Sequence, residues 1–379
     1  MLLRLVPMLL LCGALMSGEP PPAFKHDWAV AYWMCYDNGL DPAGEVILKM
    51  IAQGFKEKPA PNVAVAIQAD FKDAKGMRRY VYCGASVEES AVDSEDSADE
   101  KQLTDFLEWF AAQHPARRFI LVLLDHGGRL DEMCLDENPA AAEKHWMSGR
   151  ALGERLRAFK PKLPGRWELF FIQQCGRGTL ENLYHIRGTA GHLLCSPVRV
   201  GTPNRYYAAL HQFLAGKPEA TGAEAAAKIA AADRDYAVFT LVRAAKLPEV
   251  PARLDRALAP LLAGELPPVS LPRVIYSEDD EQNRDLRAFL QVLAEAQPAG
   301  KEAVAEFVTW LREELCPEVY YHPRLKELKA EESLSGLAVF VPANREQAER
   351  YRDLDLYQAA KLGELWKKLP NSQAVKKPR

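Results

Sequence analysis

The segment WELFFIQQCGRG, residues 167–178, runs from a continuous apolar stretch into two glutamines, Cys175 and two glycines that flank Arg177. A short segment that is apolar on both faces is typical of a strand buried inside a parallel sheet. Four more segments have the same character: 28–36, 62–70, 119–125 and 191–196. The sequence therefore predicts a sheet built mostly from buried parallel strands.

Helical patterns separate these strand segments. Apolar side chains recur at helical spacing in residues 101–113 and again in residues 148–159. We expect a capping box at Ser97–Glu100 to begin the first helix and Ser148 to cap the second. This alternation predicts an α/β fold with right-handed crossovers, in which helices flank a doubly wound, mostly parallel sheet.

The chain changes character after residue 216. Alanine-rich helical segments follow, then a proline-rich link, further helices and a late apolar run at 336–342. We therefore predict an α/β domain at 24–215 and a helical or mixed C-terminal region at 216–379 that packs on it.

Composition excludes several classes of protein. The chain has 379 residues, of which 48% are hydrophobic and 26% charged, so it is not a disordered or fibrous chain. The formal net charge is −4. Because there is no basic excess, we do not expect nucleic acid as a partner. We expect a monomer.

The N-terminus resembles an export signal. Residues 1–18 combine Arg4, an apolar run and small residues before a proline-rich stretch, which is typical of a signal peptide. We expect export to a periplasm, an envelope or the medium, and no transmembrane helix once the signal is removed. A lipid anchor at Cys12 is the less favoured alternative because the preceding residue, Leu11, is not small. An uncleaved anchor is a third alternative.

Cysteine usage points to neither a metal site nor a disulfide scaffold. Seven cysteines are scattered along the chain, with no CxxC pair and no metal-ligand spacing. We therefore predict no zinc site. One or two disulfides stay open in an exported chain.

Two of the predicted strands end in reactive side chains. The run FILVLLDHGG ends in Asp125, His126 and two glycines, and the run WELFFIQQCGRG carries Cys175 after its strand, 49 residues beyond the histidine. Sites in doubly wound sheets form at the carboxyl ends of strands, so neighbouring strands would bring an imidazole and a thiol together. Taken alone, such a cysteine is usually a buried core residue.

Several segments in order along the chain resemble the clostripain family of cysteine peptidases, in the caspase-like clan. They are WMCYDNGLD, the helix and strand ending in LLDHGG, GHLLCSPVRVGTPNRYY, and the closing stretch that begins SLSGLAVFVP. The spacing from histidine to cysteine also resembles the caspase pattern. The resemblance implies a caspase-hemoglobinase-like α/β fold with a catalytic domain at 24–215.

The resemblance also implies a mechanism. His126 and Cys175 would form a dyad that hydrolyses peptide bonds through a thioester, with a peptide or protein as substrate. Backbone N–H groups of Gly127 and Cys175 would hold the oxyanion. Asp125 would have a structural role, because adjacent strand residues face opposite sides. The chemistry requires no cofactor. Calcium is associated with the family, and the acidic loop at 93–100 is a candidate position for it, although it lacks the spacing of an EF-hand.

The sequence departs from the family near the expected specificity pocket. Gln173 and Gln174 replace the family's aspartate and alanine before the cysteine, and Pro203 stands where an aspartate for basic side chains is expected. Cleavage after arginine or lysine is therefore not expected, and a polar or acidic side chain would fit better. Candidate substrate-binding residues are Gln173, Ser196, Arg199 and Arg205.

Two further hypotheses follow from these departures. If the basic pocket is gone, self-cleavage at Lys144 or Arg150, in the loop between the histidine and the cysteine, is not expected and the chain acts intact. The altered pocket also favours an alternative function, in which the protein is a catalytically inactive homologue that binds or scaffolds.

Overall fold

The structure is a computed structural model, and it describes residues 23–72, 74–139, 143–233, 235–266, 283–342 and 344–369. The predicted signal peptide at 1–18, with the alternative anchor at Cys12, lies outside the described residues.

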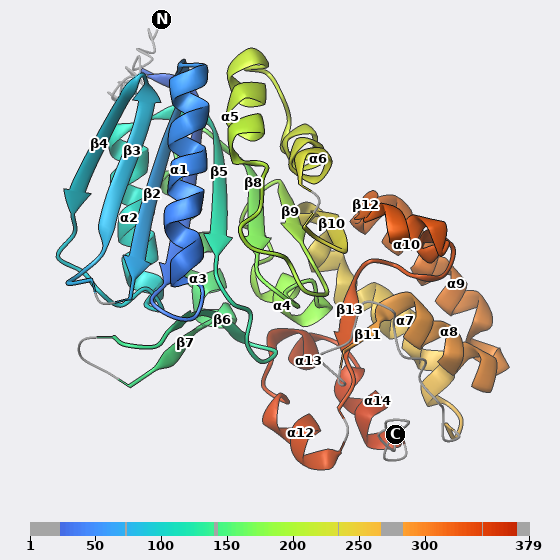
Figure 1. Cartoon of the computed structure of the whole chain (residues 1–379). Helices are drawn as coiled ribbons and strands as arrows, with labels where there is room; N and C mark the ends of the chain where they lie inside the picture. The colour runs from blue at the N-terminus through green and yellow to red at the C-terminus, as the bar shows by residue number, and fades with distance from the viewer. Residues whose placement is uncertain are drawn as a thin grey trace, which may run out of the picture.

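A single nine-stranded sheet dominates the molecule, in the order β12-β10-β9-β8-β5-β1-β2-β3-β4 (Figure 1). The five central strands are parallel, and the two strands at each end run antiparallel to their neighbours. The strands of this sheet are β1 (His26–Tyr36), β2 (Ala60–Phe71), β3 (Arg78–Gly84), β4 (Ser86–Ala91), β5 (Ala116–Leu124), β8 (Arg166–Gln173), β9 (His192–Cys195), β10 (Val238–Arg243) and β12 (Glu318–Tyr321). Two small antiparallel pairs are β6 (Glu132–Asp136) with β7 (His145–Ser148), and β11 (Asn283–Asp285) with β13 (Ala338–Phe340).

Helices cover both faces of the sheet. They are α1 (Asp41–Glu57), α2 (Glu100–Gln113), α3 (Gly149–Phe159), α4 (Leu180–His185), α5 (Tyr207–Gly216), α6 (Gly222–Ala232), α7 (Val250–Leu262), α8 (Leu286–Ala296), α9 (Lys301–Trp310), α10 (Pro323–Glu327), α11 (Ala330–Ser333), α12 (Arg345–Arg350), α13 (Asp355–Ala359) and α14 (Leu362–Lys368). Shorter turns of 3-10 or π helix lie at 160–162, 244–249, 298–300 and 311–315.

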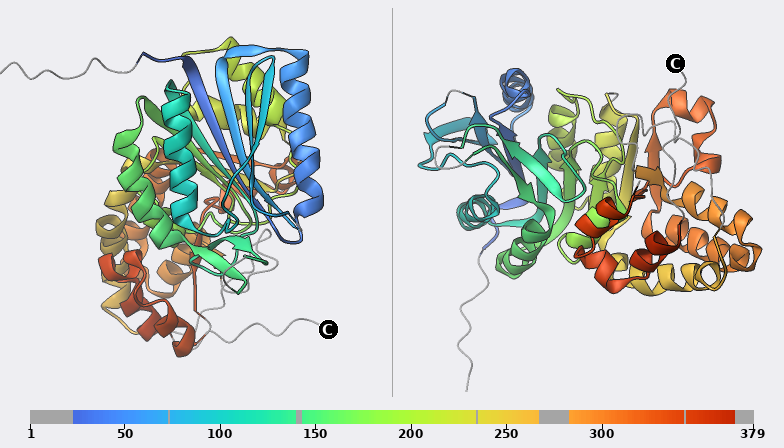
Figure 2. Two further views of the ribbon diagram at one scale, coloured as in Figure 1. Left: turned by 90° about the vertical axis from the view of Figure 1, so that its left-hand side faces the viewer. Right: turned by 90° about the horizontal axis from the view of Figure 1, so that it is seen from below.

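Alternate residues of β1 divide the core into two layers. Trp28, Val30 and Tyr32 pack with α1, α5 and α6, whereas Ala31 and Trp33 pack with α2, α3 and the C-terminal helices. The left view of Figure 2 shows α1 on one side of the sheet and α2 and α3 on the other. Burial on both faces explains why these strands are apolar throughout. The expected α/β fold, with a mostly parallel sheet between helices, is confirmed.

Strand β5 lies directly beside β8 in this sheet, in parallel. The loop after β5 begins with Asp125 and His126, and the loop after β8 carries Gln174 and Cys175. Because parallel neighbours end at the same edge, both reactive side chains lie at the carboxyl edge of the sheet.

The two predicted helix caps have different outcomes. Ser148 caps α3 as expected, and its side chain accepts a hydrogen bond from the backbone N–H of Ala151. The predicted cap at Ser97 is wrong. Asp99 caps α2 instead, accepting from the N–H of Lys101, while the Ser97 N–H and hydroxyl both donate to the carboxylate of Asp136.

The C-terminal region contributes to the same sheet. Strand β10 pairs with β9, and β12 extends the sheet from β10. The nine strands therefore cross the predicted domain boundary at residue 216, and that boundary itself stays a prediction. The late apolar run forms β13, which pairs with β11 outside the main sheet. No helix among the described residues combines the length and the apolar character needed to cross a membrane.

Candidate active site

Asp125 holds the start of the loop that carries His126 through hydrogen bonds to its carboxylate. This carboxylate is buried and accepts hydrogen bonds from the Nδ2 of Asn38 (2.8 Å) and the backbone N–H of Leu135. Burial raises the pKa of Asp125 well above its ordinary value. Its oxygens are thus used inside the protein, which agrees with a structural role for Asp125.

Residues 127–133 fold back on themselves after the histidine. The N–H of Gly128 donates to the carbonyl of Glu132 (3.1 Å), and the N–H of Glu132 donates to the carbonyl of Arg129 (2.9 Å). Gly127 forms an isolated bridge with Met133. We call this segment, together with His126, the histidine loop (126–133).

The histidine loop touches the turn that carries Cys175. A Cβ atom placed on Gly127 would lie 2.0 Å from the carbonyl oxygen of Cys175 and 2.8 Å from the Nε of Arg177. Such contacts are impossible for a real side chain, so the approach requires glycine at residue 127. Gly176 has a φ of +68°, the left-handed conformation that lets the chain turn sharply just after the cysteine. The structure therefore brings the two predicted loops into direct contact.

The thiol of Cys175 is half-buried and faces residue Val200, just beyond β9. Its Sγ accepts from the backbone N–H of Val200 (3.4 Å) and lies 3.7 Å from the carbonyl oxygen of the same residue. Among the described residues, no hydrogen bond joins this thiol to the imidazole of His126. The thiol is thus held by main chain on the β9 side of its own strand.

The imidazole of His126 is also half-buried, and its Nε2 lies near Gly39, beyond the end of β1. Partial burial lowers the pKa of His126 below its ordinary value, with opposing smaller effects of Glu137, which raises it, and Lys144, which lowers it. Desolvation of the imidazolium explains the direction, because burial penalises the charged form. At neutral pH this imidazole is therefore uncharged and able to accept a proton.

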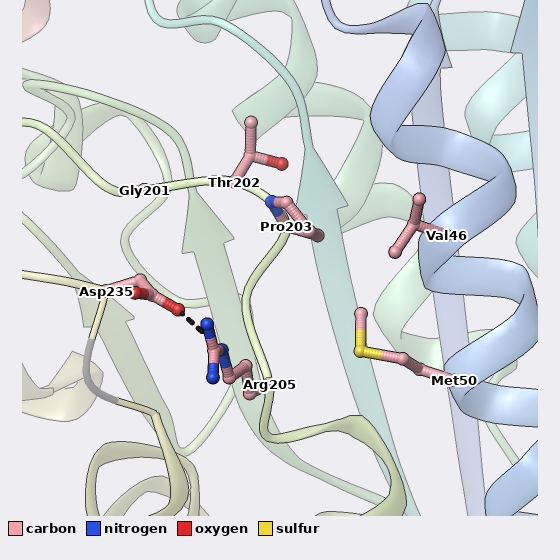
Figure 3. Close-up of a pocket in the computed structure, with 7 residues that line it drawn as sticks. All are labelled: Val46, Met50, Gly201, Thr202, Pro203, Arg205 and Asp235. Atoms are coloured by element: carbon pink, nitrogen blue, oxygen red, sulfur yellow. Dashed lines mark ion pairs between the residues drawn. The ribbon is translucent and has the colours of Figure 1, made fainter.

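A pocket of about 610 Å³ opens beside the segment that holds the thiol. Val46 and Met50 of α1 form its apolar wall, and Arg205 and Asp235 form an ion pair across from them, with 3.3 Å between Nε and Oδ2 (Figure 3). The pocket is also lined by Gly201, Thr202 and Pro203. Pro203, which stands at the expected specificity position, therefore does line a pocket next to the candidate site.

The predicted substrate-binding residues lie in different settings. Gln173 is only 4% exposed, donates to Asn204 and Tyr207, and accepts from the hydroxyl of Tyr206 (2.6 Å). Ser196 is fully buried, and its hydroxyl closes a turn with the main chain of Val198.

Both side chains therefore use their polar atoms internally. Arg199 is exposed, and Arg205 lines the pocket. Substrate contact by these four residues stays a prediction, with Arg205 the best placed of them.

Three buried carboxylates lie together at the ends of β1, β2 and β6. Asp37, Asp70 and Asp136 each place an oxygen within 4.8 Å of the others, and no ion pair joins any of them to a cation among the described residues. The Oδ2 of Asp70 is buried without a hydrogen bond. Burial, and then Asp136, raise the pKa of Asp70 to about 8. An all-oxygen donor set of this kind fits a hard cation such as calcium.

Calcium binding at the acidic loop, residues 93–100, stays a prediction. Three of its carboxylates have other partners: Asp96 lies 3.4 Å from His145, Asp99 caps α2, and Glu100 accepts from the N–H of Ser148. The buried triad, which no sequence spacing revealed, is a second candidate position for calcium. A second group, Cys35, Asp125 and Cys134, offers softer ligands.

The two basic residues considered for self-cleavage differ in placement. Lys144 lies beside β7 and pairs with Glu137 (2.7 Å). Arg150 lies in the first turn of α3, where its Nε is 3.1 Å from the carboxylate of Asp355. Cleavage after Arg150 would require this helix end to open.

Arg177 is the site residue that sequence reasoning missed. It is 2% exposed, and its guanidinium donates to the carbonyl oxygens of Gly128, Arg129 and Glu132 at 2.6–2.7 Å. The sequence shows it only as an arginine where the caspase pattern has glycine. Its position between two glycines, two residues after the cysteine, was the one available signal.

The nine-stranded sheet with its flanking helices is the fold of the C11, or clostripain-family, cysteine proteases. The chain is similar to the inactive zymogen of a C11 protease from Parabacteroides distasonis, with 17% identity and a TM-score of 0.64, over 89% of this chain and 99% of the other.

The chain is also similar to a secreted C11 cysteine protease from Bacteroides thetaiotaomicron in complex with an irreversible peptide inhibitor, with 14% identity and a TM-score of 0.66, over the same shares of the two chains. No protein-family model matches the sequence, and no curated protein matches it. At these identities the similarity establishes the fold alone.

Proposed function

We propose that the protein is a cysteine endopeptidase in which Cys175 is the nucleophile and His126 is the acid and base. The observation that carries the proposal is the contact between the two loops at Gly127, at the carboxyl edge of neighbouring strands in a C11 protease fold. A pocket that begins at Gly201, the residue after the Val200 that holds the thiol, supports a polymeric substrate with side chains to bury.

The first half of the reaction cleaves the peptide bond. His126 takes the proton of the Cys175 thiol, and the sulfur attacks the scissile carbonyl carbon to form a C–S bond. The carbonyl electrons move to oxygen, where the backbone N–H groups of Gly127 and Cys175 stabilise the negative charge. His126 then gives its proton to the amine nitrogen, the C–N bond breaks, and the amine leaves.

The second half releases the acyl group. His126 removes a proton from water, and the oxygen attacks the thioester carbonyl. The C–S bond breaks, the sulfur recovers the proton, and the carboxylic acid leaves. This scheme requires the thiol to leave Val200 and the imidazole and thiol to approach each other, because neither side chain bonds the other in the structure.

The pocket beside the thiol argues for a specificity other than arginine or lysine. Pro203 offers no charge, and the apolar wall at Val46 and Met50 accepts aliphatic surface. Arg205 would receive a polar or acidic tip when a substrate displaces Asp235 from its exposed ion pair, which costs little. Profiling with a peptide library tests this preference, and dominant cleavage after arginine or lysine would refute it.

Export is part of the same proposal. Residues 1–18 provide the signal, and the similar protease from B. thetaiotaomicron is itself secreted. Fractionation of cells that produce the full chain would test it, with loss of residues 1–18 in the released protein as the expected result.

A binding or scaffolding role is the second candidate function. The observation that favours it is the thiol held by Val200 rather than by the imidazole. An acyloxymethylketone probe separates the two functions. Covalent capture that disappears in Cys175→Ala and in His126→Ala supports the peptidase, whereas no capture with any probe side chain supports the binding protein.

A further inference from the structure

Arg177 links the two loops of the candidate site. It follows Cys175 by two residues, and all four of its hydrogen bonds described here go to main-chain carbonyl oxygens. One acceptor is the carbonyl of Cys175 itself, at 3.3 Å from Nε. The other three, Gly128, Arg129 and Glu132, belong to the histidine loop.

The hydrogen bonds from Gly128 to Glu132 and from Glu132 to Arg129 lie within the histidine loop and fix its shape. The far side of the loop is held by residues 148–150, because Asp131 accepts from Gly149, Ser148 and Arg150. On the side that faces the cysteine, Arg177 supplies the side-chain hydrogen bonds. The guanidinium of Arg177 crosses from one loop to the other. Three of its bonds measure 2.6–2.7 Å, the short lengths typical of a charged donor.

The geometry suits arginine and no other residue. A planar guanidinium donates in several fixed directions at once, so one side chain reaches three carbonyls that face a common centre. A lysine ammonium is a single point on a flexible stem and cannot hold the same three acceptors with the same rigidity. Gly127 completes the fit, since a Cβ there would lie 2.8 Å from the Nε of Arg177.

We propose that Arg177 is a positioning residue, which sets the place of the His126 imidazole relative to the Cys175 thiol by holding the histidine loop through its carbonyls. The inference rests on the proposed peptidase function. It deepens that function, because the departure from the caspase pattern at residue 177 becomes part of how the dyad is assembled.

The test compares two lysine variants of the full chain. Arg177→Lys keeps the positive charge but loses the planar guanidinium that donates to several carbonyls at once. Arg243→Lys is the control, since the guanidinium of Arg243 also bonds main-chain carbonyls, those of Glu313 and Glu314, and makes none of the described contacts with the histidine loop. Circular dichroism and thermal melting first establish that both variants are folded.

Two measurements then address the proposal. Hydrogen exchange of peptides that cover 126–133 reports the loop without any need for activity. We expect faster exchange there in Arg177→Lys and wild-type exchange in Arg243→Lys. We also expect kcat/KM to fall about 100-fold in Arg177→Lys, chiefly through kcat, as small misplacements of catalytic groups do.

The pH dependence of Cys175 alkylation by iodoacetamide completes the test. In Arg177→Lys it should approach that of His126→Ala, and in Arg243→Lys it should match the wild type. A folded Arg177→Lys variant with wild-type loop exchange would overturn the proposal. Failure of the peptidase function would look different: wild type and His126→Ala would then alkylate alike and turn over no peptide, while loop exchange would still report on Arg177.

Discussion

At the scale of single residues, Gly127 carries the closest contact between the two loops. Alanine there would place a Cβ 2.0 Å from the carbonyl oxygen of Cys175, so the loops would have to separate. We expect Gly127→Ala to lower kcat/KM by about 100-fold and to reduce the free energy of unfolding by about 1–3 kcal/mol.

The control for this variant is Gly216→Ala. Nothing lies within 4 Å of a Cβ added at Gly216. Peptide hydrolysis should therefore give wild-type values for the control, and chemical denaturation should show no loss of stability. Equal activity of both variants would contradict the close approach at Gly127.

The depressed pKa of His126 predicts a shifted acid limb in the pH profile. Protonation of the imidazole removes the base, and burial moves that protonation below pH 6.5. The fall in kcat/KM on acidification should therefore have its midpoint below 6.5.

The neighbours of His126 should move this midpoint in opposite directions. Glu137→Gln removes a group that raises the pKa of the imidazole, so the midpoint should fall further. Lys144→Gln removes a group that lowers it, so the midpoint should rise. Profiles of the two variants that move together would rule out His126 as the titrating group.

The reactive side chains and the buried strands were readable from the sequence, whereas the burial of the polar side chains around the site was not. His126 and Cys175 stand out because each follows an apolar strand. Gln173 also stands at the end of an apolar strand, yet it is buried. Its amide bonds Tyr206 and Asn204, which lie about 30 residues further along the chain. Only the tertiary structure shows that its amide is already fully bonded.

At the scale of elements, helix caps show how far local rules extend. Ser148 was predictable because its partner, Ala151, is three residues away. Ser97 obeys the same local rule but bonds Asp136 of β6, so Asp99 takes its place as the cap. A distant carboxylate thus outcompetes a cap that the sequence favours.

Helix α4 joins the candidate site to the C-terminal region through Glu181. This buried carboxylate accepts from the N–H of Phe340 in β13 (3.1 Å) and from the hydroxyl of Tyr357 in α13 (3.0 Å). Burial raises the pKa of Glu181 to about 7. The folded state therefore holds a proton that the unfolded chain, with an ordinary pKa of 4.5, releases earlier.

The proton on Glu181 stabilises the folded state at acidic pH, and this stabilisation falls as the pH rises. The stabilisation from this proton is complete below pH 4.5 and is lost as the pH rises toward 7, about 3 kcal/mol in all. We expect Glu181→Gln to flatten that part of the stability profile, because an amide keeps an acceptor oxygen without a charge. Urea unfolding at pH 5 and pH 8 measures it, with the exposed Glu306→Gln as control. An unchanged difference between the two pH values in Glu181→Gln would contradict the assignment.

At the scale of the whole molecule, the buried triad of Asp37, Asp70 and Asp136 predicts a response to calcium. A bound cation would neutralise the repulsion between these carboxylates and stabilise the fold, by about 2.7 kcal/mol at 100 times the dissociation constant. Chelation should lower the melting temperature of the wild type, and added calcium should restore it.

Two asparagine variants make the calcium experiment specific. Asp70→Asn removes the orphaned carboxylate oxygen, so its melting temperature should not respond to calcium. Asp105→Asn, which alters an exposed pair with Lys101, should respond as the wild type does. An identical response of all three proteins would exclude the triad as the binding site.

The α/β architecture was predictable because long apolar strands alternate with amphipathic helices. The extent of the sheet was not, since β10 and β12 are only six and four residues long and lie among helices. Their pairing with β9 and with each other is decided by long-range contacts that no local pattern encodes.

Because β10 pairs with β9, the C-terminal region covers a strand edge that would otherwise be free to pair with other chains. A chain that ended at residue 215 would lack β10, and β9, with the sequence HLLC, would present its unsatisfied backbone groups to other molecules. We expect residues 24–215 alone to aggregate, whereas residues 24–379 elute as a discrete species in size-exclusion chromatography. A soluble, monodisperse 24–215 fragment would contradict this. The C-terminal region thus protects the molecule from self-association.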